Sequence, residues 1–286
     1  MVITMNQKPK FGPGGNADEF RLLGYKSTAE APVYVAKKGL DCYEYEAGRG
    51  IAGTPETLYA LGCKAKELGI AVSIHSPYFV SLSSIEPEKR EKSVGYLKET
   101  AEAGLLLGAN LMVVHTGSAA KISREVALDY AADTLKMVDK MLDVAGYPIV
   151  VGLETMGKLN QLGTLDEVLS LCKLSPRFAP VVDFGHMNAR EQGCFATADD
   201  FKRVFDRIAA ELSPEHAENL HCHFSKIEYT AMGEKKHLTF ADTVYGPDPF
   251  LFVQAVKELG VAPTVISESA GTQADDALAM KRAFEA

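Results

Sequence analysis

Six apolar runs in this chain end in a residue that can bind a metal ion or transfer a proton. The clearest is Val181-Val182-Asp183, followed three residues later by His186. An apolar run of this length predicts a buried strand, so the Asp would lie at its carboxyl end and the His in the turn beyond. Alone, this pair is also typical of a capping Asp and a loop His. The recurrence predicts a shared site, since similar runs end at His75, His115, Glu154, His221 and Glu268.

The rest of the chain alternates apolar runs with helical segments. Strands are predicted over 11–16, 40–46, 71–76, 111–115, 148–154, 178–183, 219–224 and 263–268. Helices are predicted over 54–69, 88–107, 123–144, 164–174, 197–212, 248–259 and 275–285, with helical material before residue 38. Eight strands alternating with helices predict a (β/α)8 TIM barrel, of class α/β, whose strand ends meet at one face.

No Pro/Ser-rich linker divides the pattern, so a single domain over residues 1–286 is expected. An open, doubly wound sheet is the alternative fold. Its nucleotide-binding fingerprint is missing, because Gly12-Pro13-Gly14-Gly15 lacks the GxGxxG spacing.

Composition and net charge limit the binding partners and the cellular compartment that we expect for such a site. The 286 residues are 47% hydrophobic, which allows a large core, and the net charge of −8 disfavours a broad nucleic-acid-binding surface. A metal-rich cleft would still attract phosphate. Five cysteines without a CxxC pair, and a start (Met1–Lys8) without an apolar signal segment, predict a reduced, cytoplasmic protein. No apolar run approaches the ~20 residues that a membrane span needs.

The donors at the strand ends are imidazole nitrogens and carboxylate oxygens, which suit zinc, manganese or iron. They outnumber the ligands of one tetrahedral ion. A carboxylate can bridge two ions ~3.5–4 Å apart, and such a pair can activate a hydroxide against a phosphodiester. Glu154 lies on the central strand of the set and is the natural bridge. For a lone His at a strand end, packing or hydrogen bonding remains the commoner role.

The motifs resemble those of the endonuclease IV family over nearly the whole chain. The matching segments, in order, are His75-Ser-Pro-Tyr78, His115-Thr-Gly-Ser118, Glu154-Thr with Leu162-Gly163, Asp183-Phe-Gly-His186, His221 with Ser225-Lys226, and Glu268-Ser. Members are zinc-dependent (β/α)8 endonucleases for abasic DNA. The resemblance implies hydrolysis on the 5′ side of the abasic sugar by a metal-bridging hydroxide.

The same resemblance implies three metal sites. His75, His115 and Glu154 would hold the first, and Glu154, Asp183, His221 and Glu268 the second, while His186 and His237 would belong to a third. Glu154 and Glu268 are the catalytic candidates, and Tyr78 would line the substrate site. Two Zn²⁺ ions are expected to bind tightly, with Mn²⁺ as an alternative metal.

The sequence departs from the family pattern near the third site. The family has an Asp two residues before the His that matches His237, and Lys235 stands there. We therefore expect a weaker third ion, unless Glu234 or His223 compensates. Ser81 replaces a family Asn, and Arg49 falls near a loop that members use to enter DNA. The 227–247 segment is long for a loop and is expected to cover the site and bring His237 towards the strand ends.

A second class of enzyme fits part of the same pattern. Sugar isomerases and epimerases of the xylose isomerase-like barrels hold a single divalent metal with Glu, Asp, His and Glu, as Glu154, Asp183, His221 and Glu268 would. Their two glutamates move protons on the carbon beside a carbonyl. The acidic composition and Lys235 favour this alternative, whereas His75 and His115 favour abasic DNA as the partner. A non-catalytic metal-binding or scaffolding barrel is a third interpretation.

Overall fold

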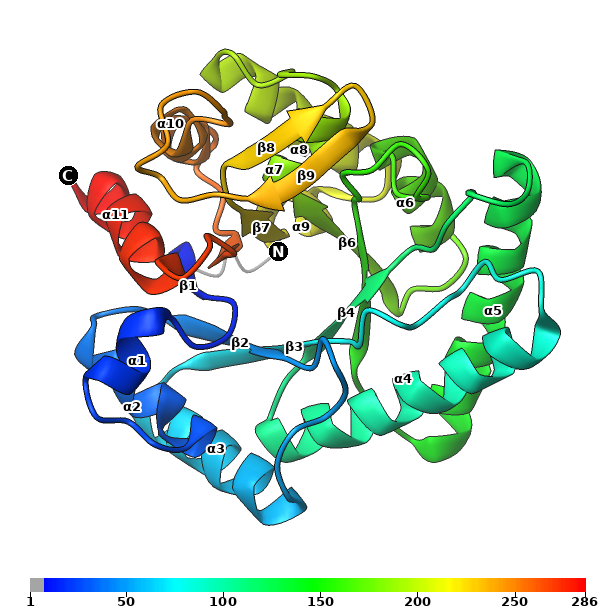
Figure 1. The fold of residues 1–286 in the computed structure, drawn as a ribbon, viewed down its shortest axis with the longest axis horizontal. Helices are drawn as coiled ribbons and strands as arrows, with labels where there is room; N and C mark the ends of the chain where they lie inside the picture. Colours follow the sequence, from blue (N-terminus) through cyan, green and yellow to red (C-terminus); the bar gives the residue numbers. More distant parts are fainter. Residues whose placement is uncertain (1–7) are drawn as a thin grey trace, which may run out of the picture.

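The computed structural model describes residues 8–286, in which eight parallel strands form one sheet (Figure 1). Hydrogen-bonded neighbours follow the order β1-β10-β7-β6-β5-β4-β3-β2. The strands are β1 (Lys10–Pro13), β2 (Cys42–Glu46), β3 (Ala71–His75), β4 (Leu111–His115), β5 (Val150–Glu154), β6 (Phe178–Asp183), β7 (His221–Phe224) and β10 (Thr264–Ser267). Each overlaps a strand predicted from the sequence. The prediction that the start of the chain has no signal segment falls largely on Met1–Gln7, which lies outside the described residues.

The first two strands bring the ends of the sheet together. The Gly15 amide donates to the Glu44 carbonyl, and the Asp41 amide donates to the Phe11 carbonyl, both at 2.9 Å. A side chain at Gly12 would meet the Cys42 carbonyl oxygen at 1.7 Å, so this close approach requires glycine. The strands therefore form a nearly closed barrel, which confirms the predicted fold and excludes the open sheet.

Helices surround the barrel and follow the strands along the chain (Figure 1). They are α1 (Asp18–Leu22), α2 (Ala31–Lys37), α3 (Pro55–Leu68), α4 (Pro87–Leu107), α5 (Arg124–Ala145), α6 (Leu165–Cys172), α7 (Phe184–Arg190), α8 (Ala198–Glu211), α9 (Pro214–Glu218), α10 (Pro249–Leu259) and α11 (Gln273–Glu285), with a 3-10 turn at Thr28–Glu30. None of the helices in this part of the chain has the length and apolar character needed to cross a membrane.

Local signals in the sequence set the helix ends. Thr54 accepts a hydrogen bond from the Thr57 amide at the start of α3, and Gly69 ends that helix at φ 70°. Thr164 and Glu167 form the predicted capping box of α6. The turns that connect strands to helices are thereby fixed close to the predicted positions.

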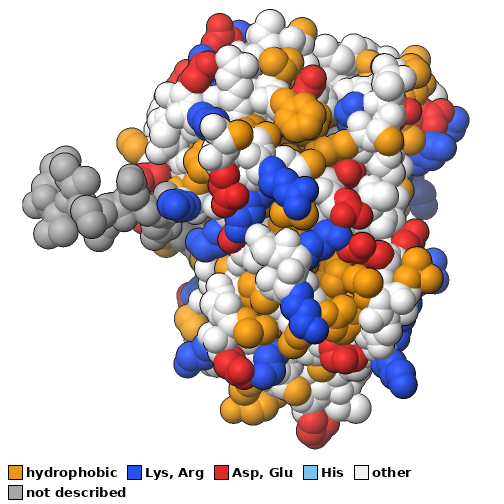
Figure 2. All heavy atoms as spheres, turned by 90° about the vertical axis from the view of Figure 1, so that its left-hand side faces the viewer, with side chains coloured by type: hydrophobic (Ala, Val, Ile, Leu, Met, Phe, Trp, Pro, Cys, Tyr) orange, Lys and Arg blue, Asp and Glu red, His pale blue; other side chains and the backbone are white. Residues whose placement is uncertain are grey.

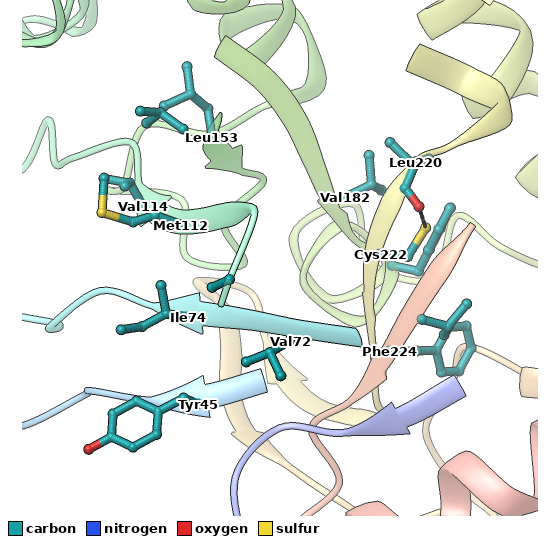
Figure 3. Packing of buried hydrophobic residues seen from close by; sticks show 14 of the residues in the cluster. Tyr45, Val72, Ile74, Met112, Val114, Leu153, Val182, Leu220, Cys222 and Phe224 are labelled. Atoms are coloured by element: carbon teal, nitrogen blue, oxygen red, sulfur yellow. Dashed lines mark hydrogen bonds between the residues drawn. The ribbon is translucent and has the colours of Figure 1, made fainter. Parts of the chain in front are cut away.

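Alternation along the strands separates the core from the barrel interior. Ile74, Val114, Leu153, Val182 and Cys222 are fully buried in the hydrophobic core, several of them drawn in Figure 3. Each precedes or follows a residue of the predicted site. Because successive side chains of a strand point to opposite faces, the neighbouring ligand candidates point into the barrel.

Two elements near the strand ends differ from the sequence prediction. His186 was expected in a turn, but it lies in α7, which starts directly after β6. The 227–247 segment was expected to be a loop, but it contains an antiparallel hairpin of β8 (Ile227–Thr230) and β9 (Gly233–His237). This hairpin packs against α7 at one side of the barrel (Figure 1).

Candidate metal centre

A first cluster of donors joins the ends of β3, β4 and β5. The Nε2 atoms of His75 and His115 lie 3.3 and 3.2 Å from Oε2 of Glu154. Parallel pairing aligns His115 with Glu154 on adjacent strands. His75 and Glu154 are almost fully buried, while His115 is partly exposed. The three ligands predicted for the first metal ion therefore lie close together.

A second cluster lies on the other side of the same carboxylate. It consists of Glu154, Asp183, His223 and Glu268, whose donor atoms all lie within 4.8 Å of one another. Nδ1 of His223 is 3.2 Å from Oε1 of Glu154 and 3.3 Å from Oε1 of Glu268. The two oxygens of Glu154 thus face different clusters, as expected of a bridging ligand.

His221 was predicted in this second cluster, and the structure does not place it there. Pairing in the sheet sets His223 beside Asp183 and His221 beside Val181, one layer deeper. The side chains at 221 and 223 share a face because they are two residues apart, so the motif alone could not decide between them. The strand register places His223, and not His221, among these donors. The sequence analysis had treated His223 only as a possible substitute for the missing Asp.

A third cluster comes from α7 and the hairpin rather than from strand ends. His186, Glu234 and His237 have donor atoms within 4.8 Å of one another. Nε2 of His186 lies 3.5 Å from Oε2 of Glu234, and the His186 and His237 ring centres are 5.3 Å apart. The 227–247 segment therefore brings His237 to the barrel mouth.

A bulge in the hairpin explains why Lys235 does not enter this cluster. Glu228 and Tyr229 are consecutive on β8, yet they pair with Lys236 and Glu234, which leaves Lys235 as the extra residue of β9. A bulge re-aims the side chains around it. Lys235 is exposed and pairs with Glu228, and the carboxylate in the cluster comes from the neighbouring Glu234.

Tyr78 forms part of the wall of the site. Its ring stacks on His115 at 5.4 Å and 21°, and its hydroxyl donates to Glu46 at 3.4 Å. The side chain remains 58% exposed, so one face is available to a substrate. A cavity of about 430 Å³ is lined by Tyr78, by members of all three clusters and by Lys158.

A second cavity, of about 480 Å³, adjoins the first and shares Tyr78, His237 and Glu268 with it. Glu46, Arg49 and Gln273 also line this cavity. Arg49 is exposed, as an ordinary surface arginine would be, but it lies at the edge of the site. The two cavities therefore lie side by side at the barrel mouth.

Sequence reasoning missed Glu44, a fully buried carboxylate inside the barrel. It lies on β2, whose run Cys42-Tyr-Glu-Tyr-Glu46 had been recognised only as an alternating strand. The signal was available, since a Glu two residues before the strand end must face the same interior as the residues at the end. Ser73 donates to Oε2 of Glu44 at 2.6 Å.

The pKa values of these buried groups are set by burial and by the charges of their neighbours. Burial raises the pKa of the Glu154 carboxyl, but the surrounding imidazoles outweigh burial and hold that pKa well below its usual range. Burial lowers the pKa of His75, but Glu154 and Glu46 outweigh it and raise this pKa to about 10. Burial raises the pKa of Glu268 to about 8. The Asp183 and Glu154 carboxylates add to this rise, whereas His223 opposes it.

The donor set fits divalent metal ions. Buried polar atoms are almost always hydrogen-bonded, yet Oδ2 of Asp183 is buried and has no hydrogen-bond partner among residues 8–286. The other oxygen, Oδ1, accepts from the His186 amide at 2.7 Å and caps α7. A cation between Asp183, His223 and the two glutamates would satisfy the orphaned oxygen. Mixed imidazole and carboxylate ligands are typical of zinc and manganese sites.

A family model described as "Xylose isomerase-like TIM barrel" matches residues 33–284. The chain belongs to this family. A relative of this xylose isomerase-like barrel, an uncharacterized protein of Methanocaldococcus jannaschii, is 32% identical over 220 residues, which cover 76% of this chain and 79% of the relative. A protein of Mycoplasma genitalium named probable endonuclease 4 is 24% identical over 226 residues, covering 72% and 75% of the two chains.

Solved structures similar to this xylose isomerase-like barrel include proteins named as an endonuclease and as an epimerase-like protein. Endonuclease IV from Thermus thermophilus superimposes with a TM-score of 0.69 at 21% identity, over 97% of this chain and 98% of its own. A D-tagatose 3-epimerase-like protein superimposes with a TM-score of 0.68 at 20% identity, over 96% of each chain. These likenesses establish the fold, and the chemistry has to be argued from the site.

Proposed function

We propose that this protein is a metal-dependent phosphodiester hydrolase that cleaves DNA on the 5′ side of abasic sites. The supporting observation is that three of the donor clusters lie at the barrel mouth, and that two of these share Glu154. A sugar isomerase with one metal needs only the cluster of Glu154, Asp183, His223 and Glu268. The pair His75 and His115, and the group on α7 and the hairpin, are then unexplained.

The residues at the site have distinct tasks under this proposal. Bound zinc ions would polarise the phosphoryl oxygens and lower the pKa of a water molecule. Glu154 would hold two ions through its separate oxygens, with His75 and His115 on one side and His223 on the other. Tyr78 offers an exposed aromatic face against which an unpaired sugar or a base can pack.

The electrostatic attraction of a DNA strand would have to come from charged groups at the barrel mouth. On the side drawn in Figure 2, Lys and Arg side chains are interspersed with Asp, Glu and apolar ones, and the whole chain carries a net charge of −8. Lys158 lines the cavity over the clusters, and Arg49 lines the adjoining one. These two cations would contact phosphates that flank the scissile bond, whereas the metal ions would contact the scissile phosphate itself.

A sugar isomerase or epimerase with a single divalent metal is the second candidate. The observation that favours it is the self-contained group of Glu154, Asp183, His223 and Glu268, in which the two glutamates both contact Nδ1 of His223, at 3.2 and 3.3 Å. A carbonyl sugar bound there would have one glutamate available to remove a proton and the other to return it.

Cleavage of a defined duplex tests the proposal. Purified, zinc-loaded protein should cut a labelled duplex at a single abasic site on its 5′ side and leave the matched intact duplex uncut. Glu154→Gln, which keeps the shape of the side chain, should be inactive. The same preparation should be offered ketohexoses with Mn²⁺. Interconversion of sugars without cleavage of abasic DNA would overturn the hydrolase in favour of the epimerase.

A further inference from the structure

The barrel interior directly beneath the metal centre contains a carboxylate that belongs to none of the predicted metal sets. Glu44 pairs in the sheet with Ser73, whereas Glu46 pairs with His75 at the strand end. Glu44 therefore lies one layer below the residues that line the site. Its side chain is fully buried.

Each oxygen of Glu44 contacts a different histidine of β7. Oε1 lies 2.8 Å from Nε2 of His223, but this contact is not aligned as a hydrogen bond, and neither atom has a hydrogen-bond partner among residues 8–286. Oε2 accepts from Nε2 of His221 at 2.9 Å, and from the Ser73 hydroxyl at 2.6 Å. Among residues 8–286, neither a Lys nor an Arg forms a salt bridge with Glu44, so imidazoles are its charge partners.

The His223 ring lies between this carboxylate and the metal centre. Its Nε2 faces Glu44, and its Nδ1 faces Glu154 and Glu268 at 3.2 and 3.3 Å. A neutral imidazole carries one proton, and the nitrogen that keeps it is set by the partner at that position. The hydrogen bond of this ring joins Nδ1 to Oε1 of Glu154. A metal ion on Nδ1 would take its place, and the carboxylate oxygen nearest to the proton then left on Nε2 is Oε1 of Glu44.

We propose that Glu44 is a positioning residue that fixes the ring orientation and tautomer of His223, with His221 and Ser73 holding Glu44 in place. His221 then has a task that explains its position in the motif without making it a ligand. Two donors occupy Oε2, so Oε1 is left for His223. Burying an ionised carboxylate is costly unless it is paired, and this pairing offsets the cost.

The inference rests on the proposed metal centre and not on its substrate. It can therefore fail while DNA cleavage is found, and it can hold while cleavage is absent. It also separates Glu44 from a merely structural residue. A structural role depends on shape, which Gln preserves, whereas control of the tautomer depends on the carboxylate charge.

The first test is the tautomer of His223 in the zinc-loaded wild-type protein. Two-bond ¹H–¹⁵N spectra of ¹⁵N-histidine-labelled protein, assigned with His223→Gln, should show the proton on Nε2 and the metal on Nδ1. The opposite tautomer would overturn the proposal without any Glu44 variant.

The second test compares Glu44→Gln with Glu167→Gln. Glu167 is also a buried carboxylate, but it pairs with Arg124 and belongs to none of the donor clusters. Glu44→Gln should weaken zinc binding about 10- to 100-fold in chelator competition, the usual effect of losing such a partner. It should also shift the ¹⁵N resonances of His223. Glu167→Gln should change neither quantity. Unchanged affinity and unchanged resonances in Glu44→Gln would overturn the proposal.

Discussion

The donor clusters at the strand ends and the cluster on the hairpin are built differently. In the first two, each ligand candidate ends a buried strand, follows it directly or, in the case of His223, stands one residue before its end, and adjacent strands hold it in register. In the third, His186 lies in the first turn of α7, while Glu234 and His237 lie on a two-stranded hairpin outside the barrel sheet. The strand clusters are positioned by the core, whereas the hairpin cluster depends on one bulge and on packing against α7.

This difference predicts how strongly substitutions in each region should affect metal binding and activity. A residue at a barrel strand end cannot move without disturbing the sheet, but a hairpin can shift by a register step. We therefore expect changes in the strand clusters to have large effects and changes in the hairpin to have graded ones.

The largest effect should follow from Glu154→Gln. Glu154 belongs to both strand clusters, so the change removes charge compensation from two groups at once. Activity should fall by about a thousandfold or more, as for loss of a central electrostatic contact. The measurement is single-turnover cleavage of the abasic duplex. A loss of less than tenfold would mean that the two strand clusters do not act through a shared carboxylate.

The next effect separates the two histidines of β7. His223→Gln should lose a tightly bound ion, because it removes a donor that lies within the second cluster. His221→Gln should keep that ion with reduced affinity, since His221 contacts Glu44 instead. Metal content after dialysis decides between them. If His221→Gln loses the ion and His223→Gln retains it, the strand register described for β7 is wrong.

These two clusters also mark the limit of sequence-based prediction. The alternation of strands and helices predicted the barrel, and the strand ends predicted His75, His115, Glu154, Asp183 and Glu268 as neighbours. The choice between His221 and His223 depended on how β7 pairs with β6, which period-two alternation cannot determine. Glu44 was overlooked because only the last residue of each run was considered.

The hairpin was harder to predict for a related reason. Its bulge moves Lys235 out and Glu234 in, and such an irregularity depends on backbone pairing that the letters Glu-Lys-Lys-His do not encode. Family resemblance therefore located the departure at Lys235 but could not decide which neighbouring side chain faces the cluster. The neighbouring Glu234 supplies the carboxylate.

A graded effect is expected for Glu234→Ala against the matched control Lys235→Ala. Removing Glu234 takes the carboxylate from the third cluster, which should lower the affinity for a third ion and reduce cleavage less than Glu154→Gln does. Lys235→Ala should leave metal content and cleavage near wild type, because Lys235 is exposed and contacts Glu228. Calorimetric titration with zinc measures metal binding in both variants, and the abasic-duplex assay measures cleavage. Equal effects in the two variants would contradict the assigned roles of the hairpin side chains.

The smallest signal concerns protons released when metal binds. In the metal-free protein the pKa of His75 is raised to about 10, and those of His186 and His223 are also raised, since nearby carboxylates outweigh burial. Near pH 7 these rings are protonated, and ligands must lose their protons to bind zinc. Calorimetry in buffers of different ionisation enthalpy should detect net release at pH 7 and less at pH 9, where Glu268, whose pKa is about 8, is already ionised. Absence of release would mean that the rings do not become ligands.

The central claim, that two ions share Glu154, is tested most directly by counting metals in wild type and in His75→Ala/His115→Ala. After dialysis against metal-free buffer, wild type should retain at least two zinc ions per chain. The double variant should retain one fewer, because its second cluster of Glu154, Asp183, His223 and Glu268 is intact. A single ion in wild type that the double variant keeps would contradict the account and favour the mononuclear isomerase.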